Sequence, residues 1–245
     1  MNRKILMAGM AAAALTTGAA SAATIDINNV LGTWTATNPG SPPINIVGSG
    51  EEIRWGSGSS GPSGYRFDSV TPPPVLGIAE EVAFDLGTFT HFNNPISANS
   101  ASLLSATLKV VTDLEIDSNP YSITSYFDFL HDETPNGANP CADGGPNGVG
   151  VNVNGCADQV TFSLNVGASD SISIGGVDYF IDILGFFYNG GLAEEFWTVE
   201  DATNVATLRG VFTSDVADVP EPGTLALLGL GLAGLGLRRK FRQAA

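Results

Sequence analysis

Short stretches in which apolar and polar residues alternate restrict most strongly how this 245-residue chain can fold. Residues 82–86 read Val-Ala-Phe-Asp-Leu, and residues 126–129 read Tyr-Phe-Asp-Phe. Such alternation gives a strand one buried and one wet face, which is typical of antiparallel sheets rather than of a parallel α/β core. The chain shows no comparable amphipathic helical pattern. We therefore expect an all-β, antiparallel protein.

The predicted strands are short, and Gly, Pro and Ser clusters separate them. Many short strands with turn signals between them favour one β-sandwich of jelly-roll type, and the length suits a single domain over residues 23–215. The loops are expected at residues 40–43, 56–64 and 72–74. The strands are expected at residues 24–28, 33–37, 44–47, 52–55, 65–70, 81–92, 106–116, 122–129, 160–166, 177–188, 196–200 and 206–213.

Residues 1–22 have the three parts of an export signal. Arg3 and Lys4 form a basic start, residues 5–15 are apolar, and Ala20-Ser21-Ala22 is a small-residue cleavage site. We predict a signal peptide that the Sec machinery reads and that is removed after Ala22.

A second targeting segment covers residues 219–245, after a short linker at residues 216–218. It contains Pro220-Glu221-Pro222, then an uncharged apolar run over residues 224–237, then the basic cluster Arg238-Arg239-Lys240. The run is shorter than the about 20 apolar residues of a permanent span, and the basic cluster favours a cytoplasmic end. We expect a C-terminal transmembrane helix that holds the precursor in the membrane only until processing.

This tail resembles the PEP-CTERM sorting signal of Gram-negative bacteria. The resemblance implies that a membrane-embedded exosortase recognises the tail and processes it near Pro220-Glu221-Pro222. The product would then reach the cell surface or the extracellular matrix. An ordinary C-terminal membrane tail is the alternative.

The part between the two targeting segments is strongly acidic. All 25 acidic residues lie between Asp26 and Glu221, against four basic ones, which leaves this part with a net charge of −21. Nucleic acid is excluded as an expected partner, because phosphate binding needs a basic surface. Divalent cations or a cation-bridged exopolysaccharide matrix fit the charge better, and a merely solubilising acidic surface is the simplest interpretation.

Several motifs inside the predicted domain carry a second resemblance. They include Leu31-Gly32-Thr33-Trp34, Ile53-Arg54-Trp55-Gly56 and Thr90-His91-Phe92-Asn93. Together they are similar to the choice-of-anchor K domain in its THxN form, with Thr90, His91 and Asn93 as the family motif. The resemblance implies surface attachment and a β-rich fold, and it brings no catalytic residues.

His91 can be read in two ways. Phe84 and Leu86 have one parity and Phe89 and His91 the other, so a bulge at Gly87 would return His91 to the core face. We then expect a buried, structural imidazole hydrogen-bonded to backbone, and no metal. The alternative is a metal site formed with His131, Asp132 and Glu133, for which no familiar ligand spacing exists.

We expect no catalytic activity. No G-x-S-x-G elbow is present, and neighbouring carboxylates such as Glu194 and Glu195 point to opposite faces of a strand. A carbohydrate-binding module is the alternative, with Trp34, Trp55 or Trp197 as a stacking platform, although such residues also serve as core. A secreted hydrolase is the weaker alternative.

The two cysteines, Cys141 and Cys156, are expected to form a disulfide because the chain is exported to an oxidising compartment. The residues between them are mainly Gly, Asn, Asp and Pro, with almost nothing to bury. Asp143, Asn147 and Asp158 offer oxygen ligands, so calcium is an alternative to a loop without cofactor, although the spacing is not that of an EF-hand.

Overall fold

The computed structural model describes residues 24–40, 44–70, 75–174 and 176–215. The predicted signal peptide with its cleavage site at Ala22, the linker and the sorting signal lie outside the described residues. Among the residues that are described, no helix is long and apolar enough to cross a membrane.

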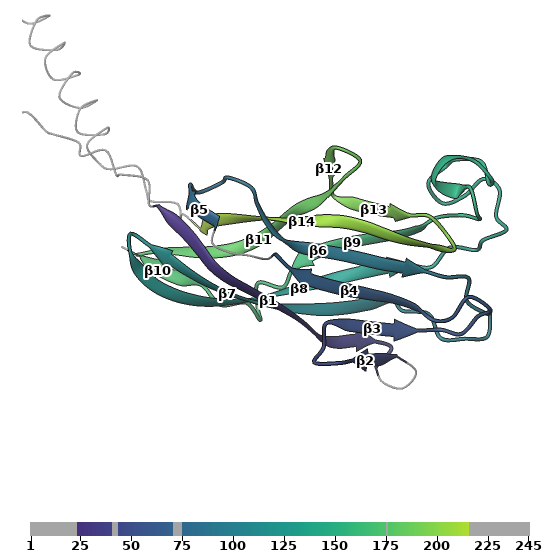
Figure 1. The fold of residues 1–245 in the computed structure, drawn as a ribbon, viewed down its shortest axis with the longest axis horizontal. Coiled ribbons are helices and arrows are strands. Elements are labelled where there is room, and N and C mark those ends of the chain that lie inside the picture. Colours follow the sequence, from purple (N-terminus) through teal and green to yellow (C-terminus); the bar gives the residue numbers. More distant parts are fainter. Residues whose placement is uncertain (1–23, 41–43, 71–74, 175, 216–245) are drawn as a thin grey trace, which may run out of the picture.

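The predicted all-β sandwich is confirmed (Figure 1). Two antiparallel sheets face each other, and the only helical element in the described part is a 3-10 turn, η1 (Gly150–Asn152). Sheet A has six strands in the order β13 (Glu195–Thr198), β9 (Asp158–Leu164), β8 (Asn119–Asp132), β7 (Ser105–Ile116), β1 (Ile25–Asn38) and β5 (Val75–Ile78). Sheet B has eight strands in the order β10 (Ile172–Ile174), β11 (Val177–Tyr188), β14 (Ala202–Asp215), β6 (Phe84–Asn93), β4 (Ser63–Ser69), β3 (Glu52–Trp55) and β2 (Asn45–Val47), with β12 (Gly191–Ala193) paired to β11.

Aromatic side chains from both sheets fill the space between them. Phe89 of β6 and Phe129 of β8 stack across the interface with ring centroids 5.3 Å apart. Trp34 of β1 contacts Tyr65 of β4 with centroids 5.7 Å apart. All four side chains are buried, because the alternating residues of each strand turn their apolar members toward the opposite sheet.

Strand β1 is longer than the sequence indicated, because residues 24–28 and 33–37 belong to one strand. Gly32 lies in its middle, directly against the ring of Phe67 on β4. A Cβ atom at position 32 would be 2.1 Å from Phe67 Cδ1, so only glycine allows this close approach of the two sheets. The glycine therefore permits tight packing here and does not end the strand.

A one-residue register shift in β6 positions His91. Leu208 of β14 pairs with Gly87, whereas the next residue, Arg209, pairs with Asp85. The bulge changes the parity of the strand, as expected from the sequence, so that Leu86, Phe89 and His91 are all buried.

Both ends of the domain lie at one end of the sandwich. Figure 1 shows the start of β1 and the end of β14 close together, whereas η1 and the loop that carries it project at the opposite end. The functional groups described below gather at this second end. The outermost strands, β13, β5, β10 and β2, contain only three or four residues each.

Candidate functional site

A buried polar cluster joins the two sheets near the end opposite to the chain termini. His91 comes from β6 of sheet B, while His131 at the end of β8 and Asp158 at the start of β9 come from sheet A. One potential ligand atom from each residue lies within 4.8 Å of those from the other two. In the part of the chain that the structure describes, no other group of His, Cys, Asp and Glu residues comes together in this way.

Aromatic rings surround the two imidazoles. The His91 and His131 rings are perpendicular to each other, with centroids 5.3 Å apart. Trp55 stacks on His91 at 5.8 Å and meets His131 edge-on at 5.2 Å. Burial lowers the pKa of both imidazoles, that of His131 to about 4, so both are neutral at ordinary pH.

Hydrogen bonds fix the rings but leave part of the cluster unpaired. His91 Nδ1 is 2.9 Å from Thr198 Oγ1, so its partner is a side chain and not the backbone that the sequence suggested. His131 Nδ1 is 2.6 Å from the Tyr65 hydroxyl, and its Nε2 is 3.3 Å from Glu133 Oε2. His91 Nε2 has no hydrogen-bond partner within the described structure.

The carboxylates of the cluster carry unpaired atoms as well. Asp158 Oδ1 accepts a hydrogen bond from the Thr134 amide at 2.8 Å, but Oδ2 has no partner among the described residues. Neither carboxylate oxygen of the buried Glu200 is paired there, and neither is Oδ1 of the buried Asn93. Buried polar atoms are nearly always hydrogen-bonded in native proteins, so several unpaired ones together require an explanation.

The acidic groups also raise one another's pKa. Burial is the main cause for Asp158, followed by the charge of Glu133. Burial likewise raises the pKa of Glu133, and it raises that of Glu200 to about 7, with the charge of Glu133 as the next cause. The cluster therefore has more acidic groups than nearby cations to balance them.

The sequence suggested Asp143, Asn147 and Asp158 as calcium ligands, but Asp158 does not lie with Asp143 and Asn147. Asp143 is exposed, and both of its carboxylate oxygens accept hydrogen bonds from the side-chain amide of Asn152, at 2.9 and 3.0 Å. The side-chain amide nitrogen of Asn147 donates to the carbonyl oxygens of Asn136 and Ala138. Asp143 and Asn147 thus organise the loop, whereas Asp158 belongs to the buried cluster.

Cys141 and Cys156 form a disulfide that closes this loop at its base, with an S–S distance of 2.03 Å. The loop is tied to the cluster through Thr134, whose hydroxyl donates to the carbonyl oxygens of Cys156 and Ala157. Thr134, whose backbone amide donates to Asp158, is therefore held by the closed end of the loop.

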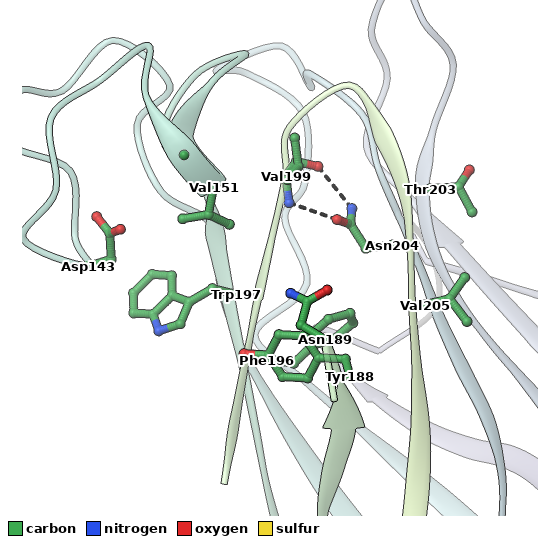
Figure 2. A pocket seen from close by; sticks show the side chains of 11 residues that line it. Asp143, Val151, Tyr188, Asn189, Phe196, Trp197, Val199, Thr203, Asn204 and Val205 are labelled. Atoms are coloured by element: carbon green, nitrogen blue, oxygen red, sulfur yellow. Dashed lines mark hydrogen bonds between the residues drawn. The ribbon is translucent and has the colours of Figure 1, made fainter. Parts of the chain in front are cut away.

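An open hollow of about 700 Å³ lies outside the cluster, between the disulfide loop, β13 of sheet A, and β11 and β14 of sheet B. Figure 2 shows Trp197, Tyr188 and Asn189 at the hollow, with Asp143 on the side of the loop. Trp197 is half-buried, and its indole nitrogen donates to Glu195 Oε1 at 2.9 Å, which fixes the ring. Reciprocal hydrogen bonds between Val199 and Asn204 hold the upper wall.

The three tryptophans have different environments. Trp34 and Trp55 are each 1% exposed and belong to the core, which removes them as stacking platforms. Trp197 is the only one of the three whose side chain is partly exposed at a hollow, since Trp55 borders a second hollow of about 250 Å³ but is itself buried. Of the Thr90-His91-Phe92-Asn93 motif, His91 and Asn93 enter the cluster, whereas Thr90 has the opposite parity and remains buried within the central strand β6.

The sequence did not predict that Asp158 and Glu200 lie in the same cluster as His91. Asp132, which the sequence offered as a ligand beside His131, is exposed and does not join the cluster. The β8–β9 ladder pairs His131 with Val160 and Asp132 with Gln159, which places Asp158 two positions from the partner of His131. In the sequence around Asp158, only the apolar Ala157 before it indicates that this strand begins in the core.

A protein-family model matches the C-terminal part of the chain. Residues 218–240 match the PEP-CTERM protein-sorting motif, which covers the Pro220-Glu221-Pro222 triplet, the apolar run and the basic cluster. No curated protein shows significant similarity to the chain. The chain therefore carries the C-terminal signal of exported, exosortase-processed surface proteins.

Proposed function

We propose that this chain is a non-catalytic structural protein of a Gram-negative cell surface or extracellular matrix, and that it has a choice-of-anchor K domain of the THxN form. The sorting motif at residues 218–240 is the observation that carries this proposal. The motif begins three residues after β14 ends, so it follows directly on the sandwich. A membrane-retained precursor with its signal peptide removed would thus precede release of residues 23 to about 219.

The arrangement of the sandwich supports this delivery route. The sorting segment continues from the end of β14, and the disulfide loop and the hollow lie at the far end of the sandwich. A precursor held by its C-terminal segment would therefore present the loop and the hollow away from the membrane. The acidic charge keeps such a surface protein soluble through self-repulsion.

Replacing Pro220, Glu221 and Pro222 with alanine tests the sorting step in a host that contains an exosortase. We expect the variant to stay in the membrane fraction at full precursor mass, while the wild-type protein loses its C-terminal segment. Replacing Pro72, Pro73 and Pro74 with alanine is the matched control and should leave processing intact. Normal release of the first variant would refute the role of the motif.

A second candidate function is binding of a carbohydrate in the hollow beside Trp197. The specific observation is a fixed, half-buried indole next to Tyr188, with the polar groups of Asn189 and Asp143 within the same hollow. An apolar ring face combined with a few polar groups is the usual composition of a small-ligand site. A neutral exopolysaccharide suits the site best, because the acidic chain repels anionic polymers.

Binding of neutral glycans to the exported protein distinguishes the two candidates. Saturable binding that is lost in Trp197→Ala, and retained in Tyr126→Ala on the outer part of β8, would establish the carbohydrate function. A purely structural protein should show no saturable binding to any of the glycans tested on a glycan array.

A further inference from the structure

We propose that His91, His131 and Asp158 bind a divalent transition-metal ion of the zinc class, which ties the two sheets of the sandwich together. The proposal concerns a different place from the hollow beside Trp197, and it does not depend on a carbohydrate function. It makes His91 of the Thr90-His91-Phe92-Asn93 motif a metal ligand and not merely a structural imidazole.

The geometry brings three ligands of two types together from three strands. The two imidazoles and the carboxylate offer atoms that all lie within 4.8 Å of one another, and all three residues are buried. Ligand atoms around one zinc ion are each about 2.0–2.2 Å from the metal, so they lie somewhat closer to each other than this limit. A small inward movement of side chains that already converge is therefore sufficient.

Unpaired atoms provide the second, independent observation. His91 Nε2 and Asp158 Oδ2 both lack a partner within the described residues, and both side chains are completely buried. A lone pair without a donor in the core is unfavourable, and a metal ion satisfies both at once. The partners on the other sides, Thr198 for His91 and the Thr134 amide for Asp158, fix these side chains with their free atoms available.

His131 completes the set and brings an outer partner. Its two nitrogens contact Tyr65 Oη and Glu133 Oε2, and one of these contacts gives way to the ion. The other then orients the ring, in the way that metal-bound histidines commonly bond to a carboxylate or hydroxyl.

The charge and the ligand types select the kind of ion. Two neutral imidazole nitrogens and one carboxylate suit zinc and similar first-row ions, whereas calcium prefers oxygen ligands throughout. Asp158 together with the nearby Glu133 carboxylate balances a divalent charge. All three ligands are buried, so the site is closed and its expected role is structural.

Metal analysis of the full-length chain tests the proposal directly. The chain is purified in detergent from a host without exosortase, dialysed, and analysed for zinc, iron, manganese, cobalt and calcium. We expect about one transition-metal ion per chain, and visible ligand-field bands when cobalt replaces zinc. Absence of a bound transition metal, or calcium in its place, would overturn the assignment.

Two variants and a matched control locate the ion. Loss of an outer-shell partner weakens metal binding about 10–100-fold. His91→Gln and Asp158→Asn remove ligands, so each should weaken zinc binding at least that much. A further variant, Glu133→Gln, removes an outer-shell partner, and its effect should fall within that range. Asp128→Asn is the control, because Asp128 also lies on sheet A and accepts hydrogen bonds from Thr107 and Asn165 but lies outside the cluster. Folded His91→Gln and Asp158→Asn proteins that keep wild-type zinc affinity would refute the site.

A measurement on the wild-type protein covers variants that fail to fold. Removal of the ion with a chelator should lower the Tm, and zinc but not calcium should restore it. A Tm that responds to neither chelator nor zinc would contradict the proposal.

Discussion

Replacing Gly32 with alanine tests the close approach of the two sheets. The new Cβ would lie 2.1 Å from Phe67 Cδ1 and 2.4 Å from Cε1, whereas carbon atoms in favourable contact are about 3.5–4.0 Å apart. The ring cannot move freely, because it is 2% exposed and its far edge lies against Gly87, where a Cβ would be 2.5 Å from Phe67 Cζ. The strands or the ring must therefore shift by more than 1 Å, roughly, to remove the overlap.

Overpacking of this kind costs about 1–3 kcal/mol in a well-packed core. In a domain of 150–250 residues each kcal/mol corresponds to about 2–4 °C, so the expected fall in Tm is about 2–12 °C. Thermal unfolding followed by circular dichroism measures it. Gly137→Ala is the matched control: nothing lies within 4 Å of the added Cβ, so the free energy of unfolding should change by less than about 0.5 kcal/mol.

A double-mutant cycle with Phe67→Leu identifies the cause. The smaller side chain should absorb the added methyl group, so the two substitutions together should destabilise the domain by about 0.5–3 kcal/mol less than the sum of the single effects. Additive effects, or a Gly32→Ala protein as stable as the wild type, would refute the reasoning.

Further predictions concern the loop, the tryptophans and the response to pH. Replacing Cys141 and Cys156 with serine should lower the free energy of unfolding by about 3 kcal/mol in urea titrations, because the unfolded chain loses a closed loop; an unchanged midpoint would contradict this. Trp55→Ala should cost about 3–5 kcal/mol in the same assay, whereas the half-buried Trp197 should tolerate alanine with a much smaller loss. Burial raises the pKa of Asp182, so its contribution to stability is complete below the unfolded-state pKa and is lost as pH rises through the higher folded-state pKa. Asp182→Asn should therefore show a smaller loss of stability between acidic and neutral pH, and an unchanged slope would count against the assignment.

The sequence predicted the sheet architecture well where the strands alternate strictly. Glu52–Trp55 and Val177–Tyr188 were predicted with their observed bounds, because a period of two identifies a half-buried strand by itself. Strands of three or four residues at the edges, such as β5, β10 and β12, were missed because too few residues alternate in them. The predicted strands at residues 24–28 and 33–37 were separated at residues 29–32, since the ring of Phe67 against which Gly32 packs lies 35 positions away in the sequence.

The candidate site was predictable only in part. The parity change at Gly87 indicated from the sequence that His91 faces the core, because a bulge reverses the alternation. Its neighbours Asp158 and Glu200 lie on segments far away in the chain, and only the pairing of strands within the two sheets and the packing of the sheets bring them near. Trp197 resembles Trp55 in its strand context, so the sequence could not separate a core ring from one beside a hollow.

The shortness of the outermost strands has a consequence for a protein that is concentrated at a surface. The long strands β1, β8 and β14, with 14 residues each, lie inside the sheets, but β1 pairs with the edge strand β5 only at Ile25 and Ile27. The outermost strands β2, β5, β10 and β13 expose a free row of amide and carbonyl groups over three or four residues each, and within the described part of the chain β11 has no partner strand on one side between its pairings with β10 and β12. At the outermost strands a neighbouring copy thus finds only short rows of free backbone, which limits the extension of either sheet into fibres there. Contacts between copies must instead be made by side chains and loops, which can be weak, numerous and reversible.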